Sequence, residues 1–406
     1  MTLSSVDLTA ALKSMRRAAR QLATPEKCSQ VLEAMGVAIA QHQDDILEAN
    51  TLDLEISRDM AVPEQVVDWL KLTPERVQTT AAIFHKLSAV GTSFATAEGG
   101  NSANGYYQTR PVGIVGFIYE AFPDLGAIAV GLCIRTGNAL VLKGGSESSR
   151  TNQIIASILQ TSLKDLDLNP DLIFPINSTE EISRRDLARC TGIDLLIPHG
   201  RPSLVEQIVQ EASVPVLPSR MGNCYLYWEA SGSLDKVCQM IIESHTGSPD
   251  AVNRIEKVLL HDSHSGNAIT RLWNRLQEEG FEIKADGLSS QNYELAPPPA
   301  EDWDRPYLTK TVAFRQVKDT TAAMDWINQH SSGHADSIVT ADYSESRKFM
   351  AGCCSASLYI NASPRFTRNA QQAEDIALGV SEHKGAAGGL IGMTAMRERQ
   401  RIRHGC

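Results

Sequence analysis

The sequence lacks the features that mark membrane, metal-binding or nucleic-acid-binding proteins. No stretch of its 406 residues approaches the roughly 20 consecutive apolar residues that span a bilayer, and its N-terminal segment has no apolar core of signal-peptide length. Its eight cysteines include no Cys-x-x-Cys pair, which predicts no metal site and a reducing, cytoplasmic setting. The formal net charge of -10 argues against nucleic acid or an anionic membrane as the main partner.

Positive charge is concentrated in one run near the C-terminus, MRERQRIRH at residues 396–404. We interpret it as a solvated or partner-facing tail, with a polyanion-binding site as the less favoured alternative.

The sequence does contain an alternation of helical segments with short apolar runs. Residues 1–90 repeat apolar side chains at spacings of three and four, which is typical of helices, and residues 91–110 are rich in Gly, Ser, Thr and Asn, which predicts an exposed hairpin or connector. From Val112 onward, runs such as GIVGFIY and NALVLKG lie between helical segments, and a second such series follows Trp228. Short apolar strands separated by helices predict an α/β fold with parallel sheets buried on both faces.

Four motifs resemble those of the gamma-glutamyl phosphate reductase family in the aldehyde dehydrogenase superfamily. They are GIVGFIYEAFPDLGAIAVGLCIRTGNALVLKGGSE from residue 113, GNCYLYWE from 222, SSGHADSIVT from 331 and LYINASPRF from 358. The resemblance covers essentially the whole chain in the same order. It implies a Rossmann-type cofactor domain over residues 1–229, with a helical N-terminus, a hairpin near 91–112 and a parallel sheet over 112–229. A second, catalytic-type α/β domain would cover 230–366, and a return segment with a small oligomerisation element and the basic tail would cover 367–406.

The resemblance also implies an activity. Such enzymes use NADPH to reduce L-glutamyl 5-phosphate to L-glutamate 5-semialdehyde in proline biosynthesis. A cysteine thiolate displaces phosphate to form a thioester, and hydride transfer then leads to the aldehyde. The implied partner is this small-molecule substrate, while homo- or hetero-oligomerisation stays open.

The predicted cofactor site is the turn Lys143, Gly144, Gly145, Ser146 and Glu147. A lysine at the end of a parallel strand, followed by two glycines and a helix start, suits an adenosine ribose and its phosphate, because the lysine supplies charge and the glycines allow close backbone approach. The alternative is an ordinary strand-to-helix turn with a surface lysine.

The segment SPDAVNRIEK from residue 248 falls where the family carries its nucleophile. The family's Cys-Asn pair is matched here by Val252 and Asn253, and Pro249, Glu256 and His261 hold the register. Valine offers only a branched alkyl group, which cannot attack a carbonyl carbon.

No other thiol takes the place of the missing one on sequence grounds. Cys224 lies in an apolar strand and Cys238 in a helix with apolar spacing, so both are interpreted as core residues, and Cys353 and Cys354 precede a buried strand.

The oxyanion-binding element also differs from the family pattern. Where the family has Arg-Pro-Asn after Tyr-Glu, this chain has Phe122, Pro123 and Asp124. A carboxylate in place of an amide donor would oppose a developing negative charge, and loss of one such donor costs roughly two to three orders of magnitude in rate. From the sequence we expect Val252→Cys to restore little, and Val252→Cys with Asp124→Asn to restore more than the product of the single effects.

The return segment has changed as well. Glu374, which we assign to cofactor binding, and His383 match the family, but the arginine that follows the histidine is absent, and PHGR at 198–201 replaces a Pro-Arg-Gly-Gly pattern. The arginine-rich tail stands where a final strand would complete an intersubunit sheet, so we expect self-association to be weaker than in the family or different from it.

Two hypotheses follow. The first is a gamma-glutamyl phosphate reductase-type enzyme, an NADP-dependent oxidoreductase with a changed or slower mechanism. The second is a catalytically inactive member with a regulatory or structural binding role.

Overall fold

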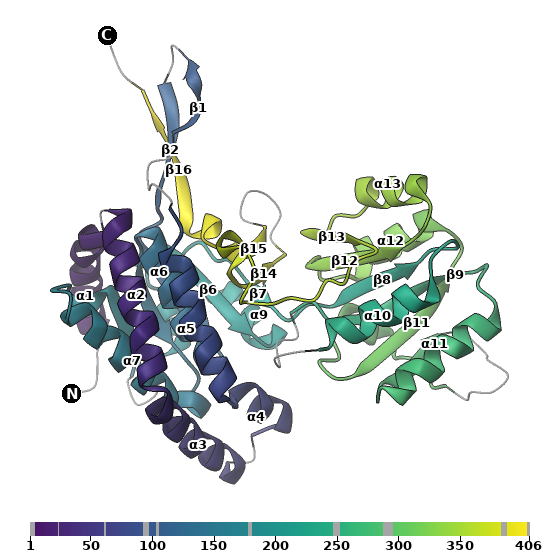
Figure 1. The fold of residues 1–406 in the computed structure, drawn as a ribbon, viewed down its shortest axis with the longest axis horizontal. Coiled ribbons are helices and arrows are strands. Elements are labelled where there is room, and N and C mark those ends of the chain that lie inside the picture. Colours follow the sequence, from purple (N-terminus) through teal and green to yellow (C-terminus); the bar gives the residue numbers. More distant parts are fainter. Residues whose placement is uncertain are drawn as a thin grey trace. The chain divides into compact units, whose positions relative to one another are not determined.

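Two parallel sheets organise the chain, each in its own compact unit (Figure 1). The computed structural model describes all residues except 1–4, 23, 61, 92–96, 103–104, 178–180, 247–251, 287–294, 383–387 and 404–406. The first unit comprises Met1–Arg220, Arg368–Gly379 and Leu390–Cys406, and the second comprises Met221–Thr367 and Val380–Gly389. The predicted α/β fold with two parallel sheets is confirmed.

The first unit is rich in helices, which make up most of its residues before residue 90 and alternate with strands after it. They are α1 (Ser5–Ala18), α2 (Pro25–Gln41), α3 (Gln43–Asp59), α4 (Glu64–Leu70), α5 (Pro74–Ser88), α6 (Pro123–Thr136), α7 (Ser149–Lys164), α8 (Arg184–Ala188) and α9 (Pro202–Glu211). α2 and α5 each begin at a proline preceded by a threonine whose hydroxyl accepts a backbone N–H of the first turn. α6 is buried around almost its whole circumference, since it packs against β3 and β4 of the sheet as well as α2, α5 and α7.

The sheet of the first unit has the strand order β5-β4-β3-β6-β7, with every adjacent pair parallel. Its strands are β3 (Ile114–Tyr119), β4 (Ala139–Lys143), β5 (Ile173–Pro175), β6 (Leu195–Gly200) and β7 (Ser219–Arg220). The chain adds β4 and β5 on one side of β3 and then returns to add β6 and β7 on its other side. The position between β3 and β6 is therefore the topological switch point of the sheet. Ligands of open α/β sheets bind at such a switch point, outside the carboxyl ends of the strands.

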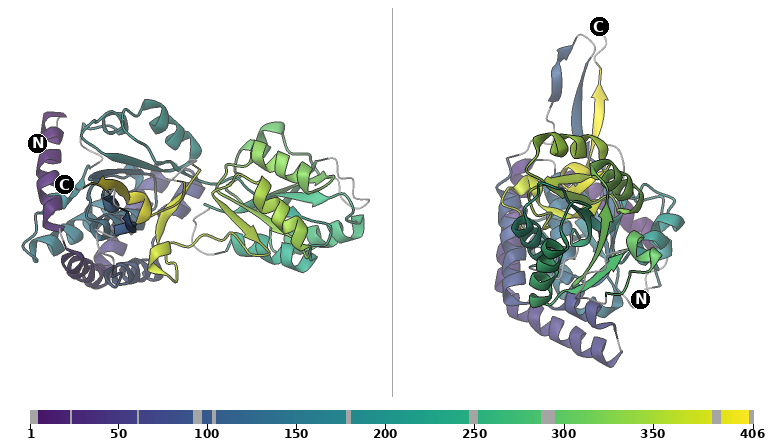
Figure 2. Two further views of the ribbon diagram at one scale, coloured as in Figure 1. Left: turned by 90° about the horizontal axis from the view of Figure 1, so that it is seen from above. Right: turned by 90° about the vertical axis from the view of Figure 1, so that its right-hand side faces the viewer.

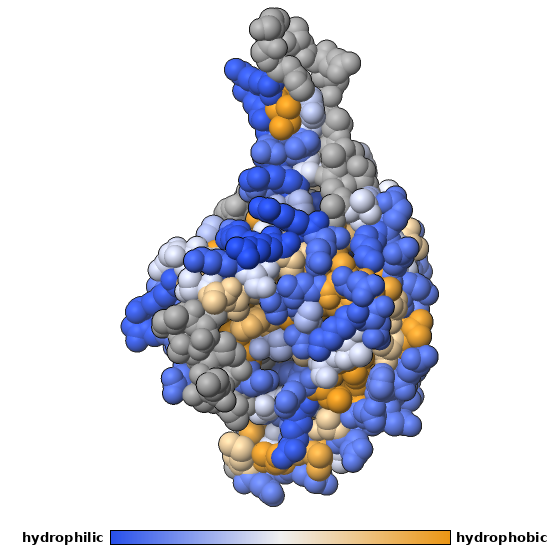
Figure 3. Space-filling view, turned by 90° about the vertical axis from the view of Figure 1, so that its left-hand side faces the viewer, coloured by the Kyte–Doolittle hydropathy of each residue, from blue (hydrophilic) through white to orange (hydrophobic). Residues whose placement is uncertain are grey.

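A small antiparallel sheet of order β1-β2-β16 also belongs to the first unit, where β2 and β16 run side by side in the right-hand view of Figure 2. Its strands are β1 (Ala97–Ser102), β2 (Gly105–Pro111) and β16 (Arg397–Ile402), and β1 and β2 are the expected hairpin. Figure 3 shows its described part as a mainly hydrophilic column. The arginine-rich segment, expected to be a tail in place of a strand, is therefore itself a strand, because it pairs its backbone with β2 of the same chain.

The second unit has a parallel sheet of order β10-β11-β9-β8-β12-β13 with helices on both faces. Its elements are β8 (Cys224–Trp228), α10 (Leu234–Ser244), β9 (Ile255–His261), α11 (Gly266–Glu278), β10 (Glu282–Asp286), β11 (Thr311–Val317), α12 (Thr320–His330), β12 (Ala335–Val339), α13 (Tyr343–Gly352) and β13 (Ser357–Ile360). β14 (Ala377–Ser381) and β15 (Gly389–Gly392) form a further two-stranded sheet.

The structure corrects two predicted boundaries. β8 was assigned to the first sheet, in a domain ending at residue 229, but it pairs with β9 and β12 of the second sheet. Its apolar sequence specifies a buried strand without specifying the neighbours it pairs with. The segment 367–406 is likewise divided between the two units, as Arg368–Gly379 and Leu390–Cys406 belong to the first.

Candidate functional site

The carboxyl ends of β3 and β6 bring together two charged residues at the switch point of the first unit. Glu120 follows β3, and Arg201 follows β6 at the start of α9. Arg201 Nε lies 3.0 Å from Glu120 Oε2, and Nη2 lies 2.5 Å from Oε1, which makes a two-point ion pair. Between them Gly200 adopts a φ of 148°, where a Cβ would lie 3.1 Å from Glu120 Cβ, so this turn requires glycine.

The predicted cofactor turn lies at the end of the neighbouring strand, β4. Lys143 is buried, and its Nζ donates a hydrogen bond to the carbonyl of Asn177 at 2.9 Å. Glu147 Oε1 accepts the backbone N–H of Ala121 at 2.7 Å, which ties this turn to the end of β3. The carboxylate also lies directly against Gly145, because a Cβ there would meet Oε1 at 1.9 Å.

A cavity of about 220 Å³ opens at this point. One wall is largely apolar and comes from the end of α3 and the start of α4, and the other carries the charged residues of the switch point. The lining residues are Ser57, Met60, Val62, Pro63, Val66, Glu120, Ser146, Glu147 and Arg201. An apolar wall facing a few convergent polar groups, beside a helix N-terminus, fits one half of a dinucleotide.

The predicted oxyanion element follows directly in the chain and has an unusual backbone. Ala121 and Phe122 both have positive φ values, of 55° and 32°, a region that side-chain-bearing residues seldom adopt. Asp124, in the first turn of α6, is held by Arg76 from α5, whose Nη2 lies 2.5 Å from Oδ1. The negative charge that the sequence places here is therefore compensated.

A buried arginine, Arg368, lies beside this turn. The guanidinium of Arg368 sits over the ring of Phe122, 5.6 Å from its centroid, and its Nη2 lies 3.4 Å from Nε2 of His199. Burial lowers the pKa of Arg368 to about 9, and burial together with Arg368 holds the pKa of His199 well below its ordinary value. His199 is accordingly neutral, with Nδ1 2.8 Å from the hydroxyl of Ser219.

In the second unit, the loop that carries the predicted nucleophile position is held by hydrogen bonds between the end of α10 and the start of β9. Ile255 donates its N–H to the hydroxyl of Ser244 and accepts a hydrogen bond from His245 Nε2 at 2.9 Å, so both ends of the loop between α10 and β9 are fixed. Val252 is fully buried, and its carbonyl accepts the N–H of Gly222 at 2.9 Å. Residues 247–251, including Pro249, lie outside the described residues.

Asn253 follows Val252 and is also buried. Its Oδ1 has no hydrogen-bond partner among the described residues. An amide oxygen buried without a partner is costly, and a bound donor would relieve that cost.

Two of the four thiols considered as replacements for the missing nucleophile, Cys224 and Cys238, are fully buried. Cys224 Sγ lies 4.0 Å from the carbonyl oxygen of Val252, but the side chain is fully buried, and burial with the nearby Asp336 carboxyl raises its pKa well above the ordinary value. Cys238 lies in the apolar core, and burial also raises the pKa of Cys353. A raised pKa suppresses the reactive thiolate. Cys354 is exposed.

Comparison with known proteins identifies the family. The model of the aldehyde dehydrogenase family matches residues 2–277. The chain is 43% identical over 384 residues to gamma-glutamyl phosphate reductase 2 of Synechocystis sp., covering 93% of this chain and 91% of that one. It is 32% identical to gamma-glutamyl phosphate reductase of Gloeobacter violaceus, covering 91% and 89%. The chain belongs to the gamma-glutamyl phosphate reductase family. The crystal structure of that enzyme from Thermotoga maritima superposes with a TM-score of 0.88 at 26% identity, covering 98% of each chain.

Two further site predictions for this gamma-glutamyl phosphate reductase family member concern residues outside the lining of the switch-point cavity. Glu374, assigned to the cofactor, is exposed in the short helix η5 (Ala373–Asp375), and His383 lies outside the described residues. The ion pairs of Glu120 with Arg201 and of Asp124 with Arg76 were not anticipated. The pair of Glu120 with Arg201 did have a sequence signal, since both residues follow the carboxyl ends of predicted strands.

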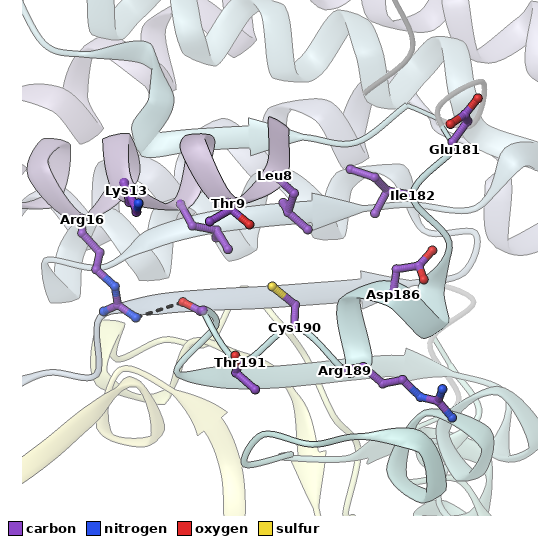
Figure 4. A pocket seen from close by; sticks show the side chains of 12 residues that line it. Leu8, Thr9, Lys13, Arg16, Glu181, Ile182, Asp186, Arg189, Cys190 and Thr191 are labelled. Atoms are coloured by element: carbon purple, nitrogen blue, oxygen red, sulfur yellow. Dashed lines mark hydrogen bonds between the residues drawn. The ribbon is translucent and has the colours of Figure 1, made fainter. Parts of the chain in front are cut away.

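A larger groove, of about 690 Å³, lies between α1 and the segment that includes α8 (Figure 4). Arg16 spans it by donating to the carbonyl of Gly192, and Cys190 is among the lining residues. It contains none of the predicted site residues. Among the described residues no group of three or more His, Cys, Asp or Glu is arranged to hold a metal ion, and no described helix has the length and apolarity to cross a membrane.

Proposed function

We propose that this protein reduces L-glutamyl 5-phosphate to L-glutamate 5-semialdehyde, the reaction of proline biosynthesis that the family resemblance implies. The observation that carries the proposal is the 43% identity, over 93% of the chain, to a relative named gamma-glutamyl phosphate reductase 2. Family membership implies a nicotinamide cofactor, and the resemblance implies NADPH as its form. A cytoplasmic location stays a prediction from cysteine usage.

We infer that the reaction proceeds without a thioester, because residue 252 offers no nucleophile and the thiol of Cys224 is buried. An acyl phosphate is already an activated acyl group. Reduced nicotinamide, when bound, supplies a hydride. Delivery of that hydride to the acyl carbon would break the bond to the phosphate oxygen and release inorganic phosphate with one proton from solvent, while Arg201, Lys143 and Glu147 would hold the dinucleotide. Loss of the covalent step predicts turnover slower than that of a thiol enzyme.

The residues that would hold the cofactor are those of the switch-point cavity. Arg201, the residue that precedes α9, and the helix N-terminus that follows it suit a pyrophosphate. Lys143 and Glu147 flank the turn after β4, where they suit ribose hydroxyl groups.

The test follows the reverse reaction of the purified chain by the absorbance of reduced nicotinamide, with glutamate semialdehyde and phosphate. We expect slow, phosphate-dependent turnover that iodoacetamide does not abolish, with no acyl-enzyme detectable by mass spectrometry. Variants Cys224→Ser and Cys354→Ser serve as matched controls and should keep this rate. Loss of turnover in either variant would show that another thiol forms a thioester.

The absence of a nucleophile at Val252 also favours a second function. If nucleotide binds but phosphate-dependent turnover is absent, the chain is a catalytically inactive member that acts by binding. The reductase proposal would then be wrong. The lack of a nucleophile at the fully buried Val252 would explain the absence of turnover.

A further inference from the structure

The carboxylate of Glu120 contacts Arg201 at three nitrogen atoms. Its Oε2 lies 3.0 Å from Nε and 3.4 Å from the backbone nitrogen, and its Oε1 lies 2.5 Å from Nη2. Glu120 is only 5% exposed, whereas the side chain of Arg201 is 45% exposed. The carboxylate is therefore held in the interior, and the guanidinium keeps access to solvent and to the cavity that both residues line.

These contacts are the ones that a bound phosphate group would make. A phosphate beside a helix N-terminus accepts backbone N–H groups, and it pairs with an arginine through two parallel hydrogen bonds. Glu120 makes both kinds of contact from within the chain, directly before α9. Gly200 allows this close approach, because a Cβ there would lie 3.2 Å from Oε2 of Glu120. The donors of Arg201 are thus already occupied by an anion of the protein itself.

We propose that Glu120 competes with the dinucleotide for Arg201, so that a pyrophosphate binds there only after the ion pair has opened. The inference rests on the proposed function, in which a reduced nicotinamide dinucleotide binds in this cavity. The exposed guanidinium turns to the ligand, while the buried carboxylate stays behind and repels the incoming phosphates. Lys143 takes no part in this competition, because its Nζ donates to the neutral carbonyl of Asn177 and its charge attracts the ligand whether the ion pair is open or closed.

Fluorescence titration of the full chain with NADPH measures the competition. Glu120→Gln removes the competing charge, so we expect the dissociation constant to fall by about tenfold or more. Arg201→Lys gives up the two-point contact with Glu120 but still attracts a phosphate, so it should bind NADPH at least as tightly as the wild type. The matched control is Glu398→Gln, which removes a carboxylate from the exposed pair with Arg110 and should leave the dissociation constant unchanged.

The outcomes separate this inference from the proposed function. Weaker or unchanged binding by Glu120→Gln would show that its carboxylate does not compete for Arg201, which overturns the inference and leaves the reductase proposal standing. If urea unfolding shows that Glu120→Gln does not fold, Arg201→Lys decides, because an affinity about tenfold below that of the wild type overturns the competition. Saturable binding of NADPH by neither the wild type nor the variants overturns both proposals.

Discussion

The guanidinium of Arg76 binds both carboxylate oxygens of Asp124, although the two residues lie 48 positions apart in the chain. Nε lies 3.3 Å from Oδ2 and Nη2 2.5 Å from Oδ1, and the side chains are only 13% and 15% exposed. The pair joins α5 to the first turn of α6, directly after the left-handed residues Ala121 and Phe122. It therefore neutralises the charge of Asp124 and helps to hold a strained turn.

A double-mutant cycle should show this coupling. We expect Arg76→Leu and Asp124→Asn to interact by about 1–3 kcal/mol, because either change alone leaves a poorly hydrated charged partner. Urea unfolding of the four proteins measures it. The pair of Arg110 with Glu398, which is 53% and 43% exposed, is the control and should couple by less than about 1 kcal/mol. Equal coupling in the two pairs would contradict a role for Arg76 in holding the turn.

Two adjacent buried residues of β9 hold the segment that leads into β11. Glu256 accepts the backbone N–H groups of Tyr307 and Leu308, the latter at 2.9 Å, and Lys257 Nζ donates to the carbonyl of Arg305 at 3.2 Å. Burial raises the pKa of Glu256 and lowers that of Lys257, while their mutual attraction opposes both shifts.

Removing one of these charges should destabilise the second unit strongly. We expect Lys257→Met to lower the free energy of unfolding by about 3–5 kcal/mol, because it leaves the carboxylate of Glu256 buried without its cation. The double variant with Glu256→Gln should cost less than the sum of the single effects. Lys284→Met is the matched control, since Lys284 contacts the same Tyr307 ring but is 24% exposed. If urea unfolding showed the same small loss in free energy of unfolding for both lysine variants, Lys257 would have no special role in stability.

The pH dependence of stability should report on His245, which closes the loop that carries Val252. Burial lowers its pKa from 6.5 to about 4. The folded state thus favours the neutral ring, so its contribution is complete above pH 6.5 and is lost as the pH falls from 6.5 towards 4, by up to about 3 kcal/mol.

His245→Gln should remove this dependence, because glutamine still offers an N–H to the carbonyl of Ile255 but does not titrate in this range. Free energies of unfolding at pH 7 and pH 4.5 measure the difference. His42→Gln, at an exposed position, is the control and should retain the wild-type loss. An unchanged pH dependence in His245→Gln would rule out this histidine as its source.

The strands and turns of the first sheet could be predicted because their apolar runs and glycines are local signals. The turn that we expect to bind the cofactor was placed in this way directly after Lys143, where β4 ends. The partner of Asp124 could not be predicted, since a pairing between α5 and α6 depends on tertiary packing. β16 was missed for a different reason. Its sequence, RERQRI, has no apolar alternation, and its strand geometry comes from antiparallel pairing with β2.

Val252→Cys is the direct test of the missing nucleophile. We expect phosphate-dependent turnover to rise by less than about tenfold, because residue 252 is fully buried and burial raises the pKa of a thiol, which suppresses the thiolate. The sequence alone predicted a larger recovery on adding Asp124→Asn. Because Arg76 already compensates the charge of Asp124, we now expect the double variant to reach no more than the product of the single effects.

The same absorbance assay measures all four proteins, and iodoacetamide separates the two routes. Alkylation should remove the rate gained by Val252→Cys and leave the rate of the valine protein unchanged, because only the variant has a thiol at residue 252. Val252→Ala is the matched control, as it shortens the side chain without adding a nucleophile and should gain nothing. Recovery of the double variant well above the product would show that the charge of Asp124 still opposes the reaction despite Arg76.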